Sequence, residues 1–66
     1  MLHHRIRALH EKIHDSGEVT DADRQEHESI RAAFPEWDAS NPTMHDRRIA
    51  ATLFGFISHR IEKAGK

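Results

Sequence analysis

The stretch that decides the fold is "RIAATLFGFISHRI", residues 48–61. Its large apolar residues recur three and four positions apart, which is the spacing of a helix face, and Thr43 is a suitable N-cap ahead of them. We predict a helix over residues 44–63. Between residues 49 and 57 the apolar residues cover more than half of the helix circumference, so a single neighbouring helix cannot bury them all. This helix is expected to lie at the centre of the core or to face a second subunit on one side.

Two shorter helices are predicted ahead of it. Residues 2–15 carry a narrow apolar seam and end before Gly17, which can adopt the left-handed conformation of a helix C-cap. Residues 21–34 follow the N-cap Thr20, and Pro35 is expected to stop this helix because proline disfavours the helical conformation of the residue before it. The seam of the first helix consists of Leu2, Ile6, Leu9 and Ile13.

The chain as a whole is predicted to be all-α, a helical hairpin plus a third helix in a single domain over residues 1–66. Sustained alternation of apolar and polar residues is missing, and there is no tyrosine and one valine, so strands are not expected. A domain of about 60 residues buries only about 60% of the surface that its unfolded chain exposes. The sequence has no cysteine, so disulfides cannot stabilise the fold, and chains of this kind often gain stability by oligomerising.

The predicted location is cytoplasmic. The longest apolar run, "IAATLFGFI" at residues 49–57, is shorter than the ~20 residues that a membrane-spanning helix needs. The first residues, "MLHHRIR", lack the apolar core of a secretory signal peptide.

Self-association is the main functional expectation. The first and third helices offer more apolar surface than the second can cover, which predicts a homodimer through residues 44–63 or 2–15. Ala51 and Gly55 lie four positions apart and would let another helix approach closely; alternatively, Gly55 makes room for a phenylalanine inside the monomer. Trp37 either covers the end of the core or anchors a partner protein. The predicted dimer or partner-binding residues are Leu53, Phe54, Gly55, Phe56, Ile57, Ile61 and Trp37.

Charge is distributed unevenly along the chain. Residues 13–46 hold nine acidic residues against two arginines, whereas residues 1–12 and 47–66 are basic. These parts should attract each other, within one subunit or between two. A nucleic-acid-binding regulator is the alternative function, with phosphate contacts from Arg5, Arg7, Arg47 and Arg48. It is ranked second because the acidic middle would repel a duplex and the chain is not basic overall.

The segment "HEKIH", residues 10–14, fits the H-E-x-x-H formula of zinc metallopeptidases, in which two histidines one turn apart bind zinc. Lys12 stands where that motif usually has an inward apolar residue, no strand is predicted to form a cleft, and no third ligand is singled out. Peptidase chemistry is therefore not expected, and no histidine is expected to pair with a serine nucleophile. His3, His10 and His14 share one helix face and could bind Zn²⁺ or Ni²⁺ adventitiously, but solvent-exposed histidines are the favoured interpretation.

These observations predict a small, non-catalytic interaction or regulatory protein without a cofactor. Its expected partners are a second copy of itself and an unidentified protein, with no membrane contact. Its size is typical of accessory factors or inhibitors from phages and mobile elements.

Overall fold

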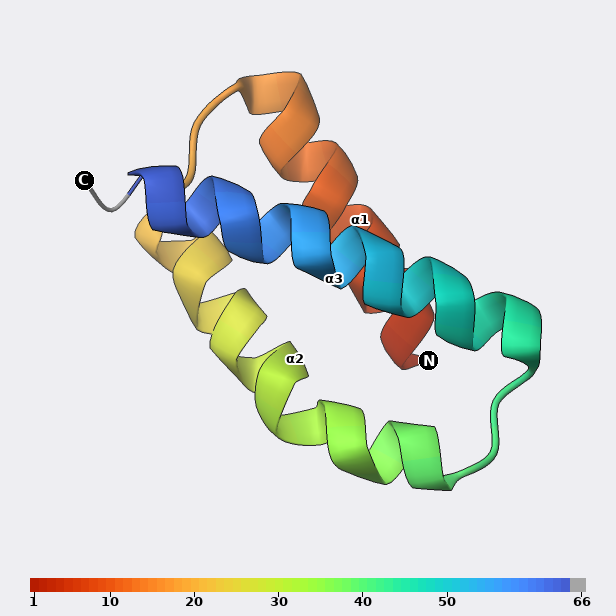
Figure 1. The fold of residues 1–66 in the computed structure, drawn as a ribbon. Coiled ribbons are helices and arrows are strands. Elements are labelled where there is room, and N and C mark those ends of the chain that lie inside the picture. The colour runs from red at the N-terminus through yellow and green to blue at the C-terminus, as the bar shows by residue number, and fades with distance from the viewer. Residues whose placement is uncertain (65–66) are drawn as a thin grey trace.

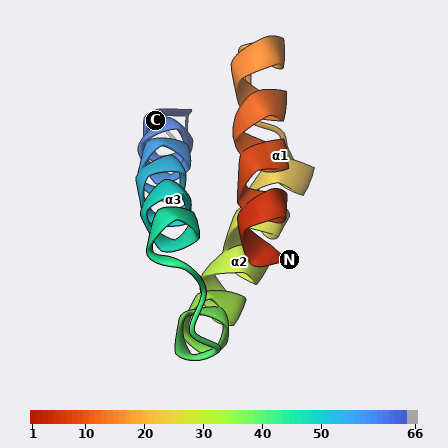
Figure 2. The same ribbon diagram turned by 90° about the vertical axis from the view of Figure 1, so that its right-hand side faces the viewer.

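Three helices make up the computed structural model, which describes residues 1–64 (Figure 1). Helix α1 spans Leu2–Ser16, α2 spans Asp21–Ala39 and α3 spans Met44–Ala64. The fold is a compact all-α three-helix unit, as predicted. Helices α1 and α3 run side by side in the same general direction, as two views at right angles show (Figures 1 and 2). Helix α2, which connects them in the chain, runs in the opposite direction. Helix α3 packs mainly on α1 and least on α2.

Local sequence signals explain most of the helix ends. Gly17 ends α1 with a φ of 74°, a conformation that costs little without a Cβ, and its amide donates to the Ile13 carbonyl oxygen at 2.9 Å. Thr20 and Asp23 form a capping box at the start of α2, in which each side chain accepts a hydrogen bond from the other residue's backbone amide. Thr43 caps α3 by accepting from the Asp46 amide at 3.1 Å.

The predicted end of the second helix was wrong. Pro35 lies inside α2, which continues to Ala39 before the chain turns at Asn41 with a φ of 67°. Proline removes one backbone donor from the helix, but the continuation brings Trp37 against the core, where its side chain is buried. The burial of that large ring explains why one missing hydrogen bond does not terminate the helix here.

The core lies along the line where the three helices meet. All four seam residues of α1 are buried, and they pack with residues from the other two helices. The buried apolar residues are Leu2, Ile6, Leu9, Ile13, Ile30, Trp37, Ala50 and Ile57. Val19, Ala33, Phe34, Leu53, Phe54 and Ile61 pack against this core and are half-buried. Within the part of the chain that is described, no helix is long and apolar enough to cross a membrane.

Candidate interaction surface

The seven residues predicted to bind a partner divide between the core and the surface. Ile57 and Trp37 are buried in the core of the single chain, with exposed fractions of 1% and 9%. Leu53, Phe54 and Ile61 are half-buried against that core. Gly55 and Phe56 are exposed, and Phe56 leaves 57% of its surface in solvent. The apolar surface that remains uncovered is therefore smaller than predicted, because α2 is longer than predicted and Trp37 covers part of the core.

An open groove lies on the surface of α3, one turn before Phe56. It has a volume of about 330 Å³ and is lined by His45, Arg48, Ile49, Thr52 and Leu53, which we call the α3 groove. His45, Arg48 and Thr52 were not predicted to line a surface with Leu53. His45 and Thr52 lie four and three positions from Ile49, and Arg48 lies four positions before Thr52; this helical spacing was the signal in the sequence that would have placed them there.

Gly55 is not accounted for by packing inside the monomer. Leaving aside its chain neighbours Phe54 and Phe56 and the backbone of its own helix, a Cβ atom built at this position would meet nothing within 4 Å among residues 1–64, so the remaining phenylalanine, Phe34, does not occupy that space. This excludes the alternative in which Gly55 makes room for an intramolecular neighbour. A glycine in the middle of a helix costs about 1 kcal/mol relative to alanine, and the single chain offers no packing reason for that cost.

Histidines from α1 extend this surface beyond Phe56. The ring centroids of His10 and Phe56 lie 6.2 Å apart, and those of His10 and His14 lie 6.3 Å apart with the two rings within 5° of parallel. His3, which was grouped with them in the sequence, lies elsewhere: it is buried, 5.9 Å from the Trp37 ring, with its Nε2 3.9 Å from Asp46 Oδ2. Among residues 1–64 no group of three histidine or acidic side chains is arranged to hold a metal ion.

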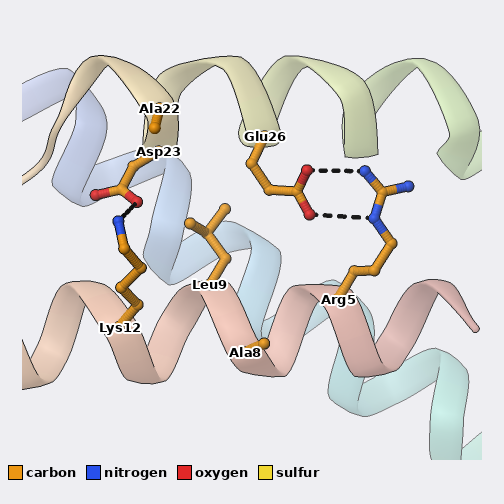
Figure 3. Close-up of a pocket in the computed structure, with 7 residues that line it drawn as sticks. All are labelled: Arg5, Ala8, Leu9, Lys12, Ala22, Asp23 and Glu26. Atoms are coloured by element: carbon orange, nitrogen blue, oxygen red, sulfur yellow. Dashed lines mark hydrogen bonds and ion pairs between the residues drawn. The ribbon is translucent and has the colours of Figure 1, made fainter.

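A second groove, of about 280 Å³, lies between α1 and α2 (Figure 3). Two ion pairs cross it: Arg5 donates to both carboxylate oxygens of Glu26, at 2.9 and 3.1 Å, and Lys12 donates to Asp23. The remaining lining residues are Ala8, Leu9 and Ala22.

Both carboxylates in this groove have lowered pKa values. The hydrogen bond from Arg5 lowers the pKa of Glu26. Burial acts to raise the pKa of Asp23, but the hydrogen bonds from Lys12 and Thr20 together outweigh it, so the pKa is lowered. These acidic groups are therefore already satisfied within the chain.

A third ion pair joins the ends of α2 and α3. Arg47 Nε lies 2.8 Å from Asp38 Oδ1, and its Nη2 donates to the Asp38 carbonyl oxygen at 3.2 Å. The basic ends and the acidic middle of the sequence thus meet within one chain. Of the four arginines proposed for nucleic-acid contacts, Arg5 and Arg47 are engaged in these pairs, while Arg7 and Arg48 are exposed on different helices.

One histidine lies within hydrogen-bond distance of a serine, a contact that the sequence did not single out. His27 Nε2 lies 2.8 Å from Ser58 Oγ, and the imidazole stacks on Phe54 with centroids 4.7 Å apart. Burial, with a smaller contribution from Arg31, lowers the pKa of His27. Ser58 lies in the interior of α3, where helical hydrogen bonds occupy the backbone amides that would otherwise form an oxyanion hole. The pair therefore has the character of a satisfied polar contact at the edge of the core.

No protein family, curated protein or solved structure matches this chain, so the functional argument depends on its own geometry.

Proposed function

We propose that this protein acts by non-catalytic protein–protein association, and that its first partner is a second copy of itself bound through the outer surface of α3. The observation that carries the proposal is Phe56, a large aromatic side chain that is 57% exposed beside the α3 groove. Aromatic residues are enriched in the surfaces through which proteins contact each other.

The charges and the glycine on the exposed side of α3 favour a second copy as the occupant. Five exposed positions follow a four-three-four-three spacing, so they lie in one stripe along the helix. We call this set the α3 seam; its members are Arg48, Thr52, Gly55, His59 and Glu62. Phe56 and Ala51 flank it on either side.

Gly55 lies at the middle of the α3 seam, and this position gives the seam a self-complementary charge pattern. In an antiparallel pair related by a two-fold axis at Gly55, Arg48 of one copy lies opposite Glu62 of the other. Opposite charges facing each other favour this register. The glycine at the axis would also allow the two helix backbones to approach closely, which gives a reason for its presence.

The strength of the association can be worked from Phe56. An aromatic side chain buries about 150–250 Å² when fully covered, so an exposed fraction of 57% leaves about 110 Å² available per copy. If half of that area is covered on each of two copies, the gain at ~25 cal/mol per Å² is about 3 kcal/mol, or about a hundredfold in the dissociation constant.

Sedimentation equilibrium of the untagged chain in chelator, from micromolar to millimolar concentrations, tests the proposal. We expect a monomer–dimer equilibrium that Phe56→Ser weakens about a hundredfold. The matched control is Met44→Ser, which removes an apolar side chain of 66% exposure near the start of the same helix and should leave the equilibrium unchanged. A wild-type chain that stays folded and monomeric at millimolar concentration would refute the proposal, and so would equal effects of the two substitutions.

A further inference from the structure

The histidine pair on α1 has the residue spacing with which two histidines bind one metal ion. His10 and His14 are one helical turn apart, with nearly parallel rings whose centroids are separated by 6.3 Å. Zinc binds imidazole nitrogen at about 2.0–2.1 Å, so two nitrogens on one tetrahedral ion lie about 3.4 Å apart. The side-chain rotations needed to bring two nitrogens to that spacing are open to the pair, because His14 is exposed and His10 is half-buried.

One chain supplies only two ligands at this place. Residues 1–64 contain no group of three or more potential ligands, whereas protein-bound zinc takes four. A metal ion held by two histidines and water alone would bind weakly and exchange readily. A four-ligand site therefore needs two more ligands from outside the chain, and a second pair of imidazoles would supply them.

The surroundings of the pair indicate where the other ligands come from. His10 lies beside Phe56, which is next to Gly55 in the chain, so the pair begins close to the proposed two-fold axis. A two-fold axis that relates two antiparallel α3 helices is perpendicular to the plane that contains them. The two α1 helices therefore lie on the same side of that plane. The histidine pairs of the two copies therefore face a common side of the dimer.

We propose that His10 and His14 of two copies together hold one zinc ion, so that zinc strengthens self-association. This rests on the proposed function, since the second copy completes the site. Four neutral imidazoles form a tetrahedral set of ligands that suits zinc. Because only the dimer would bind the ion, zinc would shift the monomer–dimer equilibrium toward the dimer by mass action. Glu11, between the two histidines, has no role in this site, so the arrangement differs from that of a peptidase.

The test combines titration of the untagged protein with zinc and measurement of its mass by sedimentation velocity. We expect one zinc per two chains and at least a tenfold tightening of dimerisation relative to chelator, with the zinc effect lost in His14→Ala. The matched control is His4→Ala, which removes an exposed histidine from another side of α1 and should retain the zinc effect.

The outcomes separate this inference from the proposed function. Zinc binding at one ion per chain without a change in mass, no zinc binding, or a zinc effect that persists in His14→Ala would each overturn it. A wild type that dimerises in chelator and ignores zinc would refute the metal site alone. A wild type that is monomeric in chelator, and dimeric with zinc only while His14 is present, would support the metal site and refute metal-free association through α3.

Discussion

Substituting Gly55 by alanine should have opposite effects on the monomer and on the dimer. In the single chain a Cβ at this position meets nothing within 4 Å, so the new methyl group causes no clash. Replacing a mid-helix glycine by alanine then stabilises the fold by about 1 kcal/mol. For a domain of this size, that corresponds to a rise of about 4–8 °C in the melting temperature. In the dimer the same methyl group would stand between two helices at their crossing, so association should weaken.

Thermal unfolding followed by circular dichroism at low micromolar concentration measures the first effect, and sedimentation equilibrium at high concentration measures the second. Ala32→Gly, at an exposed position on α2, calibrates the glycine–alanine difference in this protein and should lower stability by about 1 kcal/mol. A melting temperature of Gly55→Ala that is unchanged or lower would show that the space around this residue is not open. A dimer that is unaffected would remove Gly55 from the helix crossing.

Two further predictions concern the core. Because burial lowers the pKa of His27 below its ordinary value near 6.5, the neutral form stabilises the fold above that pH, and stability should fall as the pH drops from about 6.5 toward 5; urea unfolding at both pH values should show this loss, and His27→Gln should reduce it. Protonation of Asp23 and Glu26, whose pKa values are lowered in the fold, reduces stability only below about pH 5, outside this window. Trp37→Ala should cost about 3–5 kcal/mol, comparable to the stability of so small a domain, and should abolish the helical circular dichroism signal, whereas a tryptophan that merely anchored a partner would leave the fold intact.

Features set by neighbouring residues were predictable from the sequence. The apolar seam of α1, the Thr20 cap and the start of α3 at Met44 depend on local spacing and local hydrogen bonds, and the structure has them as expected. The end of α2 depends instead on a balance between the donor lost at Pro35 and the burial of Trp37 against helices distant in sequence. Sequence patterns reveal the donor lost at Pro35, but they do not reveal the burial of Trp37, which depends on distant helices.

The same error displaced part of the candidate site. Helical spacing alone puts His3 on one face with His10 and His14, but the extension of α2 past Pro35 places Trp37 over the beginning of α1 and buries His3 there. Phe56, the exposed aromatic residue, was among the predicted surface residues, because the apolar residues of α3 cover too wide a face for one neighbouring helix to bury. Which member of that set stays exposed depended on the relative positions of all three helices.

The packing of α1 mainly on α3 has a consequence for the order of events during synthesis. His3 lies near Asp46 and His10 near Phe56, so the contacts that complete the core join segments separated by the whole of α2 (Figure 1). While α3 is still inside the ribosome, the apolar seam of α1 lacks the helix on which it mainly packs. The nascent chain therefore remains open, and accessible to chaperones and proteases, until the third helix emerges and the unit closes in one late step.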